Sequence, residues 1–153
     1  MEVDLRTVVT ADQARAHLEL FERAGREALQ DLGIGAAPDD FLERFLAAHL
    51  EAPETLLLIA ETEAGAADVG FILVGPHTDP LSGVRTPMIL ILSVESSYRH
   101  RGLAATLVQE ARRVLARRGF DQLAARTPHG DDPLIAMGER WGFVRSWEFL
   151  ARD

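Results

Sequence analysis

The sequence contains no cysteine and no lysine. Without cysteine the chain can form no disulfide, thiolate zinc site, iron–sulfur cluster or cysteine nucleophile. All sixteen basic residues are arginine, so lysine Schiff-base chemistry and an ammonium general base are excluded as well. These two absences remove several covalent and redox mechanisms from consideration.

Long apolar runs and an excess of positive charge are also missing. No apolar run approaches the roughly 20 residues that a membrane helix needs, and the start, MEVDLRTVVTADQ, lacks the basic and apolar segments of a secretion signal. The net charge of -8 argues against an extended nucleic-acid interface, which neutralises phosphates with basic residues. We therefore expect a cytoplasmic protein that binds neither membrane nor nucleic acid.

Length and hydrophobic patterning indicate the fold class. The 153 residues, 47% apolar and 26% charged, predict a single domain over 1–153. Changes of period between helical and alternating patterns predict the order strand, helix, helix, strand, strand, strand, helix, strand, helix, strand. The predicted strands cover 3–9, 55–62, 69–75, 87–95, 120–127 and 144–151. The two helices after the fourth strand cover 103–118 and 133–140. The prediction is an α/β (α+β) fold with a mixed central sheet of about six strands and helices on both faces.

The strand at 87–95 occupies a special place in this order. Short turns make it the last strand of an antiparallel meander, and the helix at 103–118 then crosses over to a parallel neighbour. The carboxyl end of such a strand borders a crevice in which ligands bind. We therefore expect the functional site at the carboxyl end of 87–95.

The stretch SVESSYRHRGLAATLVQEARRVLARRG (93–119) begins at that point and holds six arginines. Four of them lie on the outer face of the predicted helix or near its C-terminus, where positive charge is favourable, and we interpret these as structural or solvating: Arg112, Arg113, Arg117 and Arg118. The remaining cations, Arg99, His100 and Arg101, lie at the N-terminal end of the helix, where they oppose the helix dipole. A bound anion would offset them.

A helix N-terminus offers unpaired N–H groups and partial positive charge, which together bind phosphate. Gly102 allows a conformation that a β-carbon would hinder and lets a diphosphate approach the backbone closely, and Ala104 keeps the next turn small. Other phosphate motifs fit worse, because G-x-x-x-x-G-K-(S/T) is absent and GIGAAP at 33–38 lacks both the third glycine and the preceding strand of a dinucleotide site. The pattern predicts a pyrophosphate cradle.

The turn RHRGLA at 99–104 matches the (R/Q)-x-x-G-x-(G/A) pattern of the GNAT superfamily of acetyl-CoA-dependent N-acyltransferases, and Gly-Phe at 142–143 resembles that family's C-terminal motif. The resemblance implies the GNAT fold and acetyl-CoA as co-substrate. We expect no metal. It implies that the strand end binds the pantetheine arm and that the following turn wraps the pyrophosphate. The residues concerned are Leu92, Ser93 and Val94 on the strand, Arg99, His100, Arg101, Gly102, Leu103, Ala104 and Ala105 in the turn, and Asp131, which stands where the family often has Asn.

The resemblance also implies direct attack of an amine on the acetyl thioester, but the proton-transfer residues are not obvious. Gly138 occupies the position at which many members carry the tyrosine that protonates the leaving thiolate. Met88 occupies the position at which some carry a basic carboxylate. Glu95, at the end of the strand, could act as the base through a water molecule, and Glu61 is an alternative.

Two further motifs have simpler interpretations. HGDD at 129–132 contains possible metal ligands, but it is more simply a turn and helix cap followed by Pro133 at the first helical position. Ser96 and Ser97 lie outside any G-x-S-x-G elbow, which argues against a serine hydrolase.

The sequence thus predicts an N-acetyltransferase whose acceptor is a small-molecule or peptide amine. The alternative is a CoA-binding sensor or interaction domain with little catalysis, because Gly138 replaces the tyrosine. The acceptor pocket is expected near the loops at 31–40 and 76–86. Members of the family often pair through sheet edges or C-terminal strands, so a homodimer is possible.

Overall fold

A computed structural model describes residues 3–8, 13, 16–31, 41–62, 67–127 and 132–146. The helices and strands in chain order are β1 (Val3–Val8), α2 (Leu18–Asp31), α3 (Phe41–His49), β2 (Leu56–Thr62), β3 (Asp68–Thr78), β4 (Arg85–Val94), the 3-10 turn η2 (Ser96–Tyr98), α4 (Leu103–Arg117), β5 (Ala124–Ala125) and α5 (Asp132–Arg140). None of these described helices is both long and apolar enough to cross a membrane.

The strands form one mixed sheet in the order β1-β2-β3-β4-β5. Neighbouring strands from β1 to β4 are antiparallel, whereas β4 and β5 are parallel. The predicted meander and the parallel pair beyond it are therefore confirmed, with five strands in the described part of the chain where about six were expected.

Two predicted strands differ from the structure. The strand expected at 120–127 is reduced to Ala124–Ala125, although Phe120 and Leu123 do pack against the core. Residues 144–146 lie in no strand, and the rest of the predicted last strand falls outside the described residues. Apolar residues at 120–127 correctly indicated contact with the core. A strand also needs a hydrogen-bonding neighbour, and β4 provides one over only two residues.

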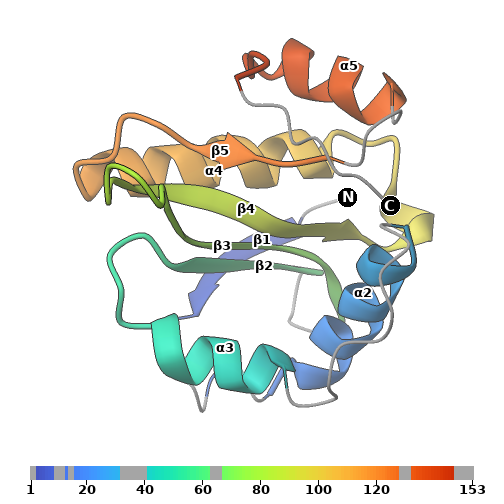
Figure 1. Cartoon of the computed structure of the whole chain (residues 1–153). Coiled ribbons are helices and arrows are strands. Elements are labelled where there is room, and N and C mark those ends of the chain that lie inside the picture. The colour runs from blue at the N-terminus through green and yellow to red at the C-terminus, as the bar shows by residue number, and fades with distance from the viewer. Residues whose placement is uncertain are drawn as a thin grey trace.

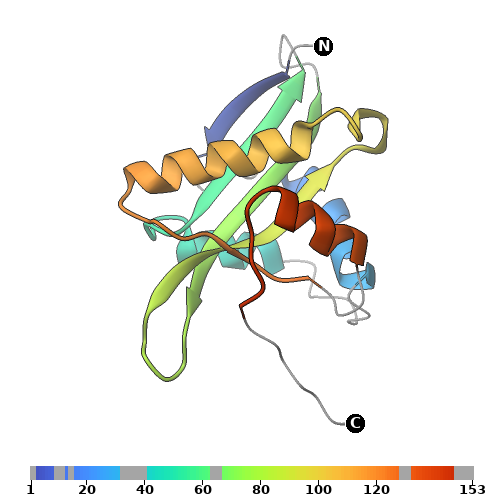
Figure 2. The same cartoon turned by 90° about the horizontal axis from the view of Figure 1, so that it is seen from above.

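Two helical layers cover the sheet, α4 and α5 on one face and α2 and α3 on the other (Figure 1). Helix α4 crosses the first face obliquely (Figure 2), burying Leu107, Ala111 and Leu115 against β2 and β3. On the opposite face, Leu20 of α2 and Leu46 of α3 pack in a second core. The sheet is therefore buried on both sides, as predicted.

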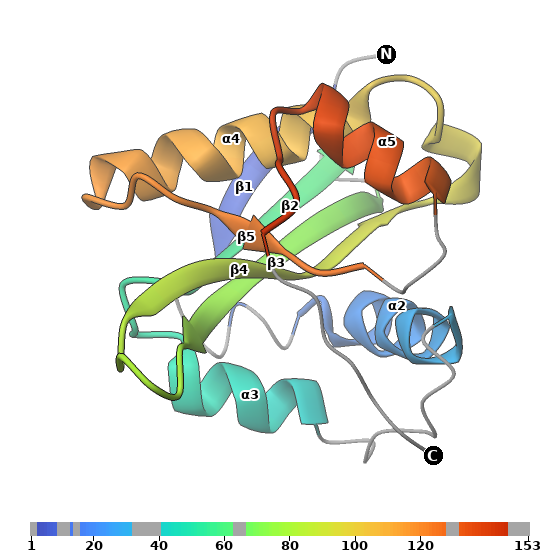
Figure 3. The ribbon, with the colours of Figure 1, turned by 45° about the horizontal axis from the view of Figure 1, so that its top comes forward.

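Strand β4 contains a bulge, and its pairing with β5 ends there. Ile89 is opposite Val74 and Ile91 is opposite Leu73, so Leu90 is an extra, bulged residue. The strand β5 pairs with Met88 and Ile89 only. Beyond the bulge, the edge of β4 that faces away from β3 has no strand partner in the described part of the chain, and the two ribbons diverge (Figure 3).

The segment 76–86 was expected as a loop near the acceptor pocket, and none of its residues lines the pocket described below. The segment forms the ends of β3 and β4 and the turn between them. Because β4 has ten residues that rise about 3.3 Å each, this turn lies roughly 30 Å from the strand's carboxyl end. The segment 32–40 lies outside the described residues.

Candidate active site

The open edge of β4 presents backbone groups that pair with no other strand in the described part of the chain. The N–H of Glu95 donates to the carbonyl oxygen of Val69 at 2.9 Å, and groups alternate in direction along an antiparallel strand. Ser93 therefore directs its backbone groups to β3, while Leu92 and Val94 direct theirs to the open edge. Of the strand residues predicted to bind pantetheine through the backbone, Leu92 and Val94 are placed to do so and Ser93 is not.

The turn after β4 alternates in backbone handedness. Arg99 is extended, with φ -70° and ψ 162°, whereas His100 has φ +62° and Gly102 has φ +79°. Turns that contain left-handed residues can gather backbone N–H groups into a concavity that binds anions. A positive φ is uncommon outside glycine, and strained backbone of this kind occurs chiefly at functional sites.

The N-terminus of α4 adjoins this concavity. Gly102 is the N-cap and provides no side-chain cap, and the first helical hydrogen bond runs from the N–H of Thr106 to the Gly102 carbonyl oxygen. The N–H groups of Leu103, Ala104 and Ala105 therefore precede the first bonded turn and have no hydrogen-bond partner among the described residues. We refer to residues 99–105 as the cradle.

The side chains of the cradle differ in their contacts. Leu103 is buried in the core and Ala104 packs against it, so these two residues can offer only backbone groups to a ligand. The Arg101 guanidinium lies over the Tyr98 ring, 5.7 Å from its centroid. The Arg99 Nε donates to the Val94 carbonyl oxygen at 2.8 Å.

The structural interpretation of the outer arginines is supported for three of them. Arg112 donates to the Trp141 carbonyl oxygen at 3.2 Å, Arg113 pairs with Glu110, and Arg118 donates to the Thr55 carbonyl oxygen at 2.7 Å. These three side chains bond α4 to neighbouring segments or to a residue within α4. The cations at the cradle are Arg99, His100 and Arg101.

A pocket of about 160 Å³ lies between α2 and the carboxyl end of β4. It adjoins the open edge of β4, on the face of the sheet opposite α4. Residues from α2, β4 and the following turn line it: Leu20, Arg23, Ala24, Glu27, Ser93, Val94, Glu95, Ser96 and Arg99.

The candidate base Glu95 lies in this pocket and forms an ion pair with Arg23 of α2. Both side chains are partly exposed, at 35% and 50%, so solvent reaches them. The alternative base Glu61 instead contacts Arg6 and is absent from the pocket lining. The structure therefore favours Glu95.

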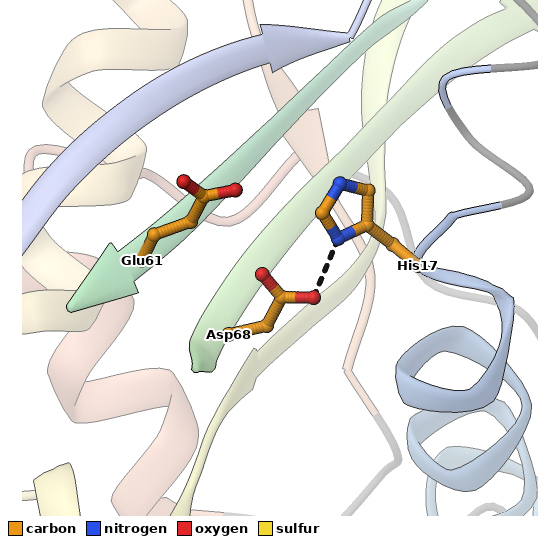
Figure 4. Close-up of side chains that lie close together, drawn as sticks. All are labelled: His17, Glu61 and Asp68. Carbon is orange, nitrogen blue, oxygen red and sulfur yellow. Dashed lines mark hydrogen bonds and ion pairs between the residues drawn. The ribbon is translucent and has the colours of Figure 1, made fainter. Parts of the chain in front are cut away.

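A charged network that the sequence did not reveal lies at the start of α2. The Nδ1 of His17 lies 2.5 Å from the Asp68 carboxylate, as Figure 4 shows, and its Nε2 lies 2.5 Å from Arg6. Because a guanidinium only donates, Nε2 accepts its hydrogen bond, and the N–H at Nδ1 donates to the Asp68 carboxylate. His17 and Asp68 are 51 positions apart, so no local pattern pointed to them.

Three members of this network could in principle ligate a metal. The ligand atoms of His17, Glu61 and Asp68 all lie within 4.8 Å of one another. However, the Arg6 guanidinium contacts both His17 and Glu61 and already supplies positive charge there. We interpret the network as an ion-paired anchor for α2. The loop at 129–131 and the candidate Asp131 lie outside the described residues.

The C-terminal motif ends α5 as expected. The N–H of Phe143 donates to the Gly138 carbonyl oxygen at 3.0 Å, and Gly142 has φ +91°, which is a common glycine-ended helix terminus. Gly138 is half-buried and offers no acidic group at the position of the family's tyrosine.

Comparison with known proteins agrees with this geometry. The family model "Acetyltransferase (GNAT) family" matches residues 13–143. The chain belongs to this family. None of the curated proteins compared with the chain matches it in sequence.

Solved structures of GNAT enzymes share the fold. Aminoglycoside N-acetyltransferase AAC(6')-Iy in complex with CoA is 19% identical, with a TM-score of 0.74 over 99% of this chain and 94% of that one. Ribosomal-protein-alanine N-acetyltransferase from Brucella melitensis biovar Abortus 2308 is 19% identical, with a TM-score of 0.69 over 99% of each chain. A predicted acetyltransferase from Clostridium acetobutylicum with acetyl-CoA is 17% identical, with a TM-score of 0.74 over 99% of this chain and 96% of that one.

Proposed function

We propose that this GNAT protein is an N-acetyltransferase that moves the acetyl group of acetyl-CoA directly to an amine. The observation that carries the proposal is the continuity of two sets of backbone donors. The open edge of β4 at Leu92 and Val94 leads directly into the cradle with its left-handed residues and the N-terminus of α4. An extended arm ending in a pyrophosphate is complementary to this arrangement.

The cradle binds acetyl-CoA mainly through its backbone. Unpaired N–H groups and the positive end of the α4 dipole favour a diphosphate. The Cβ of a larger residue at Gly102 would meet no protein atom within 4 Å, so the space beside it is open to a ligand. The pantetheine arm then extends along the open edge of β4, beside Val94 and Leu92, and brings the thioester to the edge of the pocket beside α2.

The acceptor enters through the pocket beside α2. Its neutral amine attacks the thioester carbonyl carbon, forming the C–N bond while the C–S bond breaks. Outward N–H groups of β4 stabilise the developing oxyanion. A water molecule passes the amine proton to Glu95, and the CoA thiolate takes up a proton from solvent.

A thiol-release assay tests this activity. The full chain is incubated with acetyl-CoA and a panel of polyamines, aminoglycosides, amino acids and peptides with free N-termini, and free CoA is titrated with a thiol reagent. The proposal predicts release that depends on at least one amine, with the acetylated amine as the second product. Release that no amine accelerates would contradict it.

A second candidate function, a CoA-binding sensor or interaction domain, is favoured by one observation. Gly138 leaves the position of the usual proton donor without a side chain. Such a domain would be stabilised by acetyl-CoA but would release no thiol with any amine. The two measurements together therefore separate the enzyme from the sensor.

A further inference from the structure

The pocket between α2 and β4 carries charges of both signs. Four charged side chains line it: Arg23, Glu27, Glu95 and Arg99. Arg23 and Glu95 neutralise each other in an ion pair. Within the described residues, Glu27 has no ion-pair partner, and the Arg99 side chain makes a single hydrogen bond, through Nε. The pocket thus retains one unpaired carboxylate and one guanidinium with free terminal nitrogens.

The hydrogen bond of Arg99 fixes this guanidinium in place. Its Nε donates to the Val94 carbonyl oxygen at 2.8 Å, which anchors the group at the edge of β4. The two terminal nitrogens remain, and they match the geometry of a carboxylate in a bidentate pair. Arg101, in the same turn, lies over Tyr98 instead, so the two arginines of the motif have different surroundings.

Given the proposed acetyl transfer, on which this inference rests, we propose that Arg99 is a specificity-determining residue that binds a carboxylate of the acceptor. Glu27 offsets the positive charge of the acceptor's amine on the other wall of the pocket. The acceptor is then a zwitterion, an amino acid or a short peptide whose carboxylate lies close to its amine. A volume of about 160 Å³, below the roughly 300–1,000 Å³ of pockets for drug-sized ligands, agrees with a small acceptor.

The competing role for Arg99 is a contact with the CoA pyrophosphate, since the residue also belongs to the cradle. The two roles differ in the substrate whose binding depends on the side chain. Loss of a carboxylate contact raises KM for the acceptor, whereas loss of a phosphate contact raises KM for acetyl-CoA.

The test measures thiol release with three matched probe sets: the common amino acids, their carboxamides and their decarboxylated amines. We expect at least one amino acid to exceed its carboxamide and its amine in kcat/KM by about ten-fold or more, the worth of one charged hydrogen bond. In Arg99→Gln, KM for that amino acid should rise by about ten-fold and its advantage over the carboxamide should largely disappear, with KM for acetyl-CoA nearly unchanged. Arg113→Gln, which removes a guanidinium paired with Glu110 on the outside of α4, is the control and should match the wild type.

Equal turnover of amino acids and carboxamides, a preference for polyamines, or a rise in KM for acetyl-CoA in Arg99→Gln would overturn the assignment while leaving acetyl transfer intact. Failure of acetyl transfer itself looks different, because no amine in any set would then release thiol. That result would overturn this inference together with the proposed activity.

Discussion

Arg23 on α2 forms an ion pair with Glu95 at the end of β4, although the two residues are 72 positions apart in the sequence. The pair joins the helix to the strand at the wall of the pocket. Partly exposed ion pairs contribute little to stability. The main effect of this pair is therefore geometric, because it holds the Glu95 carboxylate in position directly after the end of β4. His17 and Asp68 anchor the start of the same helix.

Removing the Glu95 carboxylate should slow the reaction without impairing binding of acetyl-CoA. We expect Glu95→Gln to lower kcat by about 10²-fold, typical for loss of a general base, with little change in KM for acetyl-CoA. Steady-state thiol release measures both. Glu110→Gln, which also removes a carboxylate paired with an arginine, should keep wild-type kcat. Full activity in Glu95→Gln would show that Glu95 only holds Arg23.

A β-carbon at Gly70, which pairs with Val94 across β3 and β4, should displace the end of β4 whose open edge is proposed to bind acetyl-CoA. It would lie 2.8 Å from the backbone oxygen of Ser93, and backbone cannot move aside as a side chain can. We expect Gly70→Ala to cost about 1–3 kcal/mol of unfolding free energy and to weaken acetyl-CoA binding, measured by thermal melts with and without the ligand. Gly75→Ala, whose new atom would meet the ends of the Phe45 and Leu90 side chains, should lower stability but retain binding. Unchanged affinity in Gly70→Ala would contradict this coupling.

Gly138 in α5 and Gly142 just after it should respond to alanine substitution in opposite directions. At Gly138 a β-carbon would come no closer than 3.8 Å, to Phe143 Cβ. Gly138→Ala should therefore stabilise the protein by about 0.5–1 kcal/mol through helix propensity and raise Tm by about 1–4 °C. Gly142 has φ +91°, so Gly142→Ala should lower Tm. A fall in Tm for Gly138→Ala would mean that α5 packs more closely than described.

Asp79, in the turn between β3 and β4, should make the stability of the fold depend on pH under acidic conditions. The N–H and hydroxyl of Ser82 and the N–H of Leu81 hydrogen-bond the Asp79 carboxylate and hold its pKa below the usual 3.8. A carboxyl group with a lowered pKa in the folded state stabilises the fold above its unfolded pKa, and the contribution is lost as the pH falls through the folded pKa. The Tm difference between wild type and Asp79→Asn should thus be constant above about pH 5 and shrink below 3.8.

Asp121→Asn is the control for this pH series, because Asp121 is exposed and has no partner among the described residues. Its Tm should follow that of the wild type throughout. If the Tm difference between wild type and Asp79→Asn is as large at about pH 2 as at neutral pH, the charge of the Asp79 carboxylate does not stabilise the turn.

The cradle could be predicted from sequence because its determinants are local. A buried strand, a glycine and a helix start fall within about one turn of each other, and the backbone geometry at Gly102 follows from that spacing. The division of the six arginines was predictable for the same reason, since helix periodicity separates the outer four from Arg99 and Arg101.

The acceptor pocket could not be predicted because its walls come from distant segments. Nothing near Arg23 indicates that it faces Glu95, and nothing near Arg99 indicates that its Nε turns back to Val94. The shortness of β5 could not be predicted for a related reason. How many residues of 120–127 pair with β4 depends on the path of β4, which changes at the bulge at Leu90.

The claim that the cradle binds acetyl-CoA is tested most directly by comparing two glycine variants. The measured quantity is the rise in Tm that acetyl-CoA causes in each. Gly102 and Gly83 have similar positive φ angles, +79° and +72°, and a β-carbon at either position would have no atom within 4 Å. Only Gly102 lies in the cradle. Wild type and Gly83→Val should gain about 5–10 °C in Tm with acetyl-CoA at roughly 100 times its Kd. Gly102→Val should fold, with a similar loss of Tm from backbone strain, and should show almost no gain. A gain in Gly102→Val equal to that in Gly83→Val would contradict the account.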